Sequence, residues 1–195
     1  MKITKKSIRT FISKTGICTP PKSGLTEEER QKYKSKFESI LKKVARRGID
    51  ELMDHLENSF FYKERCNQHH QYEGGLLEHS LEVYETACKL CKGVAPDSIA
   101  IAALLHDLGD IEGGQGHRSV QILERWNFEL NDIEKRAIKY HMWTTHSSEE
   151  KTEFERFAQK EDLWRSITVA DIISAGGYQY GEIMLKTILS IWLMV

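Results

Sequence analysis

The dipeptide His106-Asp107 carries two side chains that can bind a metal ion, and it directly follows the apolar run of residues 99–105. It stands where a buried helix would continue with core residues. Burying an imidazole and a carboxylate costs free energy unless both groups find partners. A divalent cation is the partner that suits both at once, so the dipeptide indicates a metal site.

Further candidate ligands lie on both sides of this dipeptide, namely His79, His117, His141 and Asp171. Asp171 interrupts an otherwise apolar run, residues 167–173, so its carboxylate needs a partner from elsewhere in the fold. Neighbouring residues on a helix diverge by about 100°. His106 and Asp107 can therefore bind one ion only if the end of their helix faces it.

The combined nitrogen and oxygen ligands favour some metals over others. Imidazole and carboxylate together suit Mn, Fe, Zn or Ni better than Ca, which prefers oxygen alone. The six candidates are more than one tetrahedral ion uses while a water stays bound, and they are about right for two ions that share Asp107. We expect one or two divalent metal ions, with Mg as a further candidate.

The elements that must position these side chains are all predicted to be helices, because no convincing β-type alternation occurs. Thr26 and Glu29 form a capping box that opens a helix ending at Gly48. The pair Gly74-Gly75 precedes a helix that runs to about residue 92, with His79 in its first turn. Other helices are expected over residues 50–62 (with Phe60 inward), 97–107, 117–127, 132–142 and 162–176, with a short helix before residue 15 and a last one from residue 179. Residues 108–116 are expected to form a loop and residues 149–160 a surface connection.

These residues match a known pattern. His79, His106-Asp107 and Asp171 resemble the H…HD…D signature of the HD-domain superfamily, metal-dependent phosphohydrolases with an all-α core. The segment from His69-His70 through Gly74-Gly75 to His79 is similar to HD-domain 3′→5′ exoribonucleases and to HD domains of some conjugative relaxases. The resemblance implies an HD-domain helical bundle over residues 63–195, preceded by a basic helical extension over residues 1–62.

The resemblance also implies roles for individual residues. His79, His106, Asp107 and Asp171 would hold a first ion, and Asp107, His117 and His141 a second, with the last three at the catalytic step. Many family members have a lysine where this chain has Asp110. Its phosphate-binding role would pass to the metals, Arg118 or Lys139. Independently of the resemblance, the position of His69 and His70 before the glycine pair is compatible with contact to a substrate phosphate, and equally with a capping or solvent-exposed role.

The preferred functional prediction is hydrolysis of a phosphate ester in a nucleotide or nucleic acid by a metal-activated water. One alternative is a phosphohydrolase of small nucleotides, such as mono- or triphosphates or cyclic nucleotides. Another is a metal-bound regulatory or interaction module whose chemistry has lapsed. An iron-dependent oxygenase is a remote fourth hypothesis.

Composition sets the broader limits. With 195 residues, 40% hydrophobic and 29% charged, the chain has the values of one globular domain, with or without an appendage. It has no apolar stretch of about 20 residues and no apolar segment behind its basic N-terminus, so we expect a cytoplasmic protein without a membrane span.

Cys88 and Cys91 are expected to pack within a helix. The apolar end, residues 191–195, packs on its own core or against a second subunit.

Charge is distributed unevenly along the chain. Residues 1–47 have a balance of +10, whereas the remaining residues have −11. Such a basic segment can meet a polyanion, and it can equally be a solvated helix face.

Overall fold

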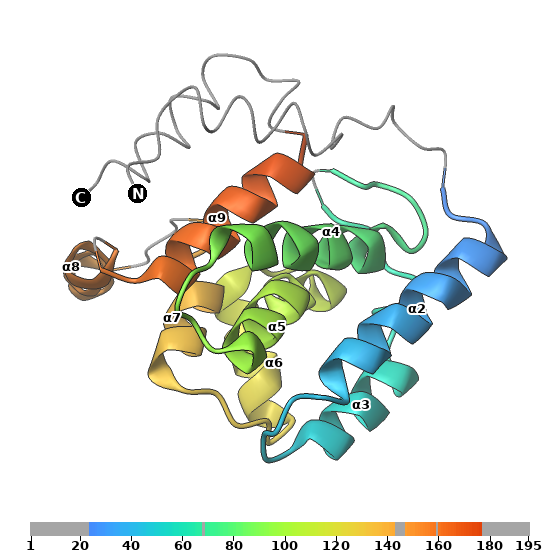
Figure 1. Cartoon of the computed structure of the whole chain (residues 1–195), viewed down its shortest axis with the longest axis horizontal. Helices are drawn as coiled ribbons and strands as arrows, with labels where there is room; N and C mark the ends of the chain where they lie inside the picture. Colours follow the sequence, from blue (N-terminus) through green and yellow to red (C-terminus); the bar gives the residue numbers. More distant parts are fainter. Residues whose placement is uncertain (1–23, 68, 143–146, 159, 177–195) are drawn as a thin grey trace.

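The computed structural model describes residues 24–67, 69–142, 147–158 and 160–176, and these ranges contain helices and no strand, which confirms the predicted all-α class. Figure 1 shows α4 crossing the molecule between α9 and α2. The elements are α2 (Glu27–Leu41), α3 (Ile49–Asn58), α4 (Gly75–Leu90), α5 (Pro96–Leu105), the 3-10 helix η1 (Leu108–Glu112), α6 (Gly116–Arg125), α7 (Asp132–Lys139), α8 (Ser148–Phe157) and α9 (Asp162–Ser174).

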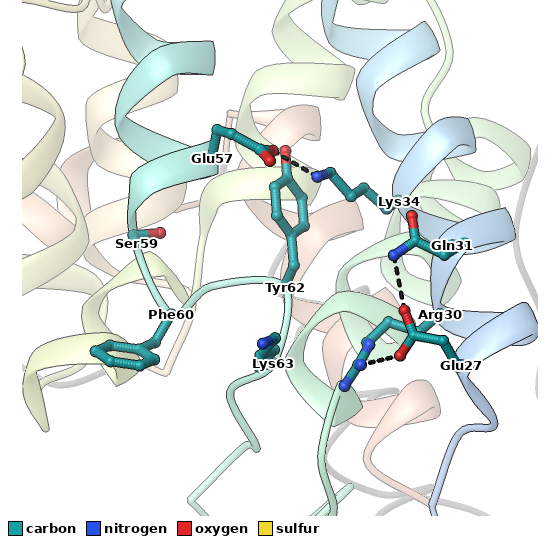
Figure 2. Close-up of a pocket in the computed structure, with 9 residues that line it drawn as sticks. All are labelled: Glu27, Arg30, Gln31, Lys34, Glu57, Ser59, Phe60, Tyr62 and Lys63. Carbon is teal, nitrogen blue, oxygen red and sulfur yellow. Dashed lines mark hydrogen bonds and ion pairs between the residues drawn. The ribbon is translucent and has the colours of Figure 1, made fainter.

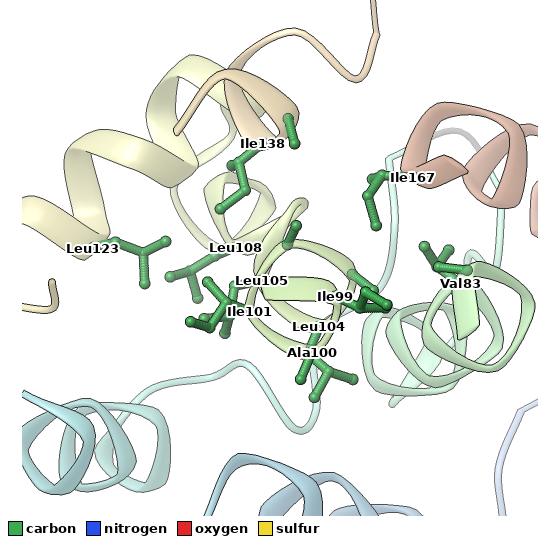
Figure 3. Close-up of a cluster of buried hydrophobic side chains, with 14 of the residues drawn as sticks. Val83, Ile99, Ala100, Ile101, Leu104, Leu105, Leu108, Leu123, Ile138 and Ile167 are labelled. Carbon is green, nitrogen blue, oxygen red and sulfur yellow. The ribbon is translucent and has the colours of Figure 1, made fainter. Parts of the chain in front are cut away.

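Helix α5 is the centre of the hydrophobic core. All of its residues from Ser98 to Leu105 are buried, and it contacts α2, α4, α7 and α9. Figure 3 shows Ile101, Leu104 and Leu105 on α5 together with Leu123 of α6 and Ile138 of α7. A helix that is apolar on every side is stable only inside a protein, since each fully buried aliphatic side chain contributes about 1.5–3 kcal/mol. This burial holds the end of α5, and thus His106, in a defined place.

The first helices pack onto the same core. The predicted capping box of α2 is present, with Glu29 N–H donating to Thr26 Oγ1 and Thr26 N–H donating to Glu29. Phe37 of α2 is fully buried against Phe61, at 5.1 Å between ring centroids. The division of the chain at residue 62 remains a prediction.

Two predictions about this region are wrong. Helix α2 ends at Leu41, and Gly48 instead lies before α3, where its φ of +84° is a left-handed conformation that glycine adopts without strain. Phe60 is not inward: α3 stops at Asn58, and the Phe60 side chain beyond it is 76% exposed.

Two segments that were not predicted as helices are helical. Residues 108–112, predicted as loop, form η1, and residues 148–157 form α8 rather than a surface connection. Ser147 caps α8 by accepting a hydrogen bond from Glu150 N–H, and Phe157 is buried beside Trp164 of α9. A serine cap and two phenylalanines three residues apart outweigh the high charge of this stretch.

The connection between α2 and α3 is tied to the far side of the core. Glu134 is fully buried, accepts hydrogen bonds from Arg46 and Ser98 at 2.6 Å each, and also caps the start of α7.

The expectation that Cys88 and Cys91 pack within a helix is wrong. Cys88 lies in α4 but is exposed, and Cys91 packs against the core but follows the last residue of α4.

The predicted first helix, the last helix and the apolar end at residues 191–195 lie outside the described residues. None of the described helices is both long enough and apolar enough to cross a membrane.

Candidate metal centre

Three imidazoles and two carboxylates from four separate places in the chain converge inside the bundle. His79 comes from the first turns of α4, His106 from the end of α5, and Asp171 from α9. His79 Nε2 lies 3.1 Å from His106 Nε2 and 3.2 Å from Asp171 Oδ1. Five of the six ligands predicted from the sequence therefore meet here, and the sixth, His117, does not. The remaining two of the five are Asp107, which directly precedes η1, and His141, which follows α7.

Asp107 occupies the middle of the group. Its Oδ2 lies 3.3 Å from Nε2 of both His79 and His106, and its Oδ1 lies 3.1 Å from His141 Nε2. The two oxygens of one carboxylate thus face different imidazoles. This is the arrangement required of a carboxylate that bridges two cations.

The chain turns at His106-Asp107, which allows both side chains to face the same space. Helix α5 ends at Leu105, and Asp107, the residue directly before η1, has a φ of −101°. Ser119 of α6 holds the turn, because its hydroxyl donates to His106 O at 2.6 Å and accepts from Gly109 N–H at 2.8 Å. The expectation that the helix end faces the ion agrees with this geometry.

Each imidazole is oriented by a hydrogen bond to its other nitrogen. Nδ1 of His106 lies 2.9 Å from Ala103 O, and Nδ1 of His141 lies 2.7 Å from Ile138 O. A carbonyl oxygen only accepts, so each Nδ1 carries the proton and each Nε2 of the neutral ring presents a lone pair.

His79 is oriented by a longer relay. Its Nδ1 lies 2.9 Å from Ser174 Oγ, and that hydroxyl donates to Glu82 Oε2 at 2.6 Å. The hydroxyl proton is used on Glu82, so Ser174 accepts from His79 Nδ1–H. The Nε2 lone pairs of His79 and His106 then face each other at 3.1 Å, an arrangement that requires a cation or a proton between them. The donor types and their orientation fit a divalent metal ion.

The imidazoles and carboxylates of the centre shift one another's pKa values toward their charged forms. Burial lowers the pKa of His79, but Asp107 and Asp171 outweigh it and raise that pKa to about 10. Burial is likewise outweighed by Asp107 at His141, whose pKa rises to about 9. Burial favours the neutral form of both carboxyl groups, yet the surrounding imidazoles hold the pKa of Asp171 below and that of Asp107 well below the usual range. Protonated imidazoles here take the part of a cation.

His69 also reaches the centre. Its ring lies 4.4 Å from the His79 ring between centroids, and its ligand atom is within 4.8 Å of those of His79, Asp107 and Asp171. Burial lowers the pKa of His69 to about 4, which keeps this ring neutral and able to bind a cation. His70, by contrast, faces Glu82, at 3.3 Å from its Nε2.

The glycine pair before α4 is what allows the His69–His70 segment to pack so closely. A Cβ on Gly75 would lie 1.9 Å from His70 O, which is a severe overlap with backbone. Only glycine therefore permits this segment to lie against the start of α4 beside His79.

The other predicted site residues lie apart from the convergent group. His117 Nε2 lies 3.2 Å from Glu150 of α8, and Lys139 Nζ lies 2.6 Å from the same carboxylate. Arg118 is exposed and pairs with Glu112 and Gln121. Among the described residues, the groups with metal-binding geometry do not include His117.

Several residues in contact with the centre were missed in the sequence. Ser174 was missed although it lies three residues after Asp171 on α9, where helical spacing places it beside a predicted ligand. Glu82 was not missed in this way, because its place three residues after His79 on α4 already suggests from the sequence that it could orient the imidazole. Glu150 was missed because α8 was not predicted. Cys66 and Asp110 also place ligand atoms within 4.8 Å of an Asp107 oxygen.

A separate cavity of about 370 Å³ lies between α2 and the segment after α3, and none of the convergent residues lines it. Figure 2 shows Lys34 paired with Glu57 and Arg30 paired with Glu27, while the Phe60 ring points away from them. These four lining charges are thus paired with one another, and the cavity adds nothing to the metal centre.

Comparison with known proteins gives two matches. A family model described as HD domain matches residues 76–176, slightly more than half of the chain. Ribonuclease Y from two strains of Ureaplasma parvum serovar 3 is 33% identical over 122 residues, which is 60% of this chain and 26% of the relative. The chain thus spans about a quarter of the length of these curated relatives. No solved structure matches the chain significantly.

Proposed function

The chain belongs to the HD-domain family of metal-dependent phosphohydrolases, and we propose that it hydrolyses a phosphate ester in a nucleotide or nucleic acid by a metal-activated water. One observation carries the proposal. Three Nε2 lone pairs and two carboxylates face one buried space, and each imidazole has its Nδ1 proton engaged elsewhere. Such preorganisation is characteristic of metal ligands.

The proposed ligand sets follow the positions of the side chains. His79, His106, Asp107 and Asp171 bind the first ion, and Asp107 and His141 bind the second. His117 joins the second ion by exchanging Glu150, at 3.2 Å from its Nε2, for the cation. When bound, such ions lower the pKa of a water and stabilise negative charge on a phosphoryl group.

The chain's own residues orient the reacting groups. Asp107 spans the two halves of the centre, since its two oxygens face His141 on one side and His79 and His106 on the other. We assign Asp107, His117 and His141 to the catalytic step. Lys139 and Arg118, whose side chains are 26% and 42% exposed, bind the substrate phosphate together with His69 and His70.

Nucleic acid is the favoured substrate class for two reasons. Ribonuclease Y, the curated relative, is by its name a ribonuclease. The +10 balance over residues 1–47 also favours a polyanion. If these basic residues contribute to binding, the affinity for RNA falls steeply with added salt.

The test is a substrate panel with the metal-stripped protein reloaded separately with Mn²⁺, Zn²⁺ and Mg²⁺. Single-stranded RNA, nucleoside mono- and triphosphates and cyclic nucleotides are scored for chain shortening, free phosphate and nucleoside. His106→Gln should abolish hydrolysis, whereas His55→Gln should retain it, because His55 is stacked on Trp126 and contacts none of the centre.

The possible outcomes separate the alternatives. Chain shortening of RNA supports the proposal as stated, and release of phosphate from mononucleotides alone supports the small-nucleotide phosphohydrolase. Metal-loaded protein that binds RNA but hydrolyses nothing on the panel contradicts an enzymatic role and favours the lapsed module.

A further inference from the structure

We propose that Cys66, Asp107 and Asp110 form an additional, sulfur-containing cation position beside the imidazole centre. It shares Asp107 with the proposed function but includes two residues outside that ligand set. The ligand atoms of these three residues all lie within 4.8 Å of one another. Ligands around a tetrahedral ion with bonds of about 2.0–2.3 Å are separated by roughly 3.3–3.8 Å, so small side-chain movements close the site.

Cys66 is a buried residue that lies outside the helices. It lies in the connection between α3 and α4, and its side chain is only 1% exposed. The described residues make no hydrogen bond to its thiol. Its sulfur is instead grouped with ligand atoms of two imidazoles, His69 and His79, as well as with the two carboxylates. A free cysteine can pack as a small hydrophobic residue, but the neighbours of Cys66 are groups that bind metal ions.

Asp110 is directed toward this place by η1. A 3-10 helix has 3.0 residues per turn, so the residue three positions after Asp107 lies on the same side of the chain. Asn67, the neighbour of Cys66, then holds the Asp110 carboxylate: its Nδ2–H donates to Oδ1 at 2.9 Å and its N–H to Oδ2 at 3.3 Å. These two bonds join the segment carrying Cys66 to η1.

The charge of this group suits a cation. Within the described part of the chain, no lysine or arginine pairs with Asp107 or Asp110, and the recorded partners are imidazoles and Asn67. A divalent cation between two neighbouring carboxylates would offset part of the cost of burying them.

The chemistry of the ligands selects the metal. Thiolate is a soft ligand that favours Zn, Fe or Co, whereas Mg and Ca favour oxygen ligands. A position made of one thiolate and two carboxylates thus predicts that Zn²⁺ or Co²⁺ binds with sulfur in its first coordination sphere. Mg²⁺ is expected to occupy this position poorly.

The experiment uses the full chain, stripped of metal and titrated with Co²⁺ in the absence of substrate. The wild-type protein should develop a near-ultraviolet charge-transfer band from thiolate to cobalt, and X-ray absorption of the Zn²⁺ form should show a metal–sulfur distance of about 2.3 Å. Cys66→Ser should lose the band and bind one Co²⁺ fewer, while still binding Co²⁺ at the imidazoles. Cys91→Ser, a matched control at a half-buried thiol, should keep the band.

Asp110→Asn provides the second variant, which leaves the thiol in place and should weaken Co²⁺ binding at the band-forming position. It decides the proposal if Cys66→Ser does not fold. Absence of both band and metal–sulfur scattering in the wild type overturns the inference, as does a band that survives Cys66→Ser. A band without hydrolysis contradicts only the proposed function, and hydrolysis without a band contradicts only this inference.

Discussion

Replacing Ser174 with alanine removes one hydroxyl from the relay that orients His79. In the structure this hydroxyl accepts from His79 Nδ1–H at 2.9 Å and donates to Glu82 at 2.6 Å. His79 is completely buried, so in Ser174→Ala no water replaces the lost acceptor. The ring becomes free to rotate or to move its proton to Nε2, and either change removes the lone pair that binds the metal.

The size of the effect follows from two independent estimates. A buried donor left without its acceptor costs about 1–3 kcal/mol. Loss of a hydrogen-bond partner behind a metal ligand typically lowers metal affinity about 10–100-fold, which corresponds to roughly 1.4–2.7 kcal/mol. The ranges agree, so we expect the dissociation constant for Zn²⁺ to rise by about 10–100-fold.

The assay is competition for Zn²⁺ against a chromogenic chelator, with circular dichroism to show that the helices are retained. Ser166→Ala is the matched control: Ser166 is fully buried on the same helix, and no hydrogen bond links it to the centre within the described residues. Glu82→Gln should give a smaller loss than Ser174→Ala. A Zn²⁺ affinity within twofold of wild type in Ser174→Ala would refute the assignment of His79 Nε2 as a ligand.

Three other predictions concern the stability of the protein. Without metal, Asp107 and Asp171 raise the pKa values of His141 and His79 to about 9 and 10. The stability that these two imidazoles contribute is therefore fully present below the ordinary histidine pKa of 6.5 and is lost as the pH rises through 9 and 10. Urea denaturation across this pH range should show the loss of stability, and His141→Gln should make that loss smaller. Gly75→Ala places a Cβ 1.9 Å from His70 O. The substitution should lower the free energy of unfolding by about 1–3 kcal/mol and weaken Zn²⁺ binding. Unchanged thermal unfolding would contradict the proposed packing. Glu134→Gln leaves Arg46 without its buried counter-charge, and should cost about 3 kcal/mol in chemical denaturation; a loss below about 1 kcal/mol would mean that this pair is not important for stability.

The helical class and several helix limits could be predicted because the signals for them are local. The Thr26–Glu29 capping box lies within four consecutive residues, and it begins α2 as expected. Prediction from local signals failed at two places: α3 ends four residues before its predicted limit and leaves Phe60 exposed, and α8 was not predicted because the high charge of its stretch hid the serine cap.

The candidate ligands were predictable by residue type, because a polar group in an apolar run needs a partner. Asp171 illustrates this: its run contains no partner, and the structure supplies His79 from a helix more than 90 residues earlier in the chain. The partners of His117 and Cys66 were not predictable in this way. His117 faces Glu150 of α8, and Cys66 becomes buried only because the connection before α4 folds over the centre.

The sequence by itself determined which residue types meet and that helices carry them, since periodicity, caps and unpartnered polar groups are properties of short segments. Only the tertiary structure decided which atoms face one another. The direction of an imidazole lone pair depends on the acceptor behind its other nitrogen, and for His79 that acceptor is Ser174, 95 residues away. Packing of α9 against α4 brings the two together, and no local pattern carries that information.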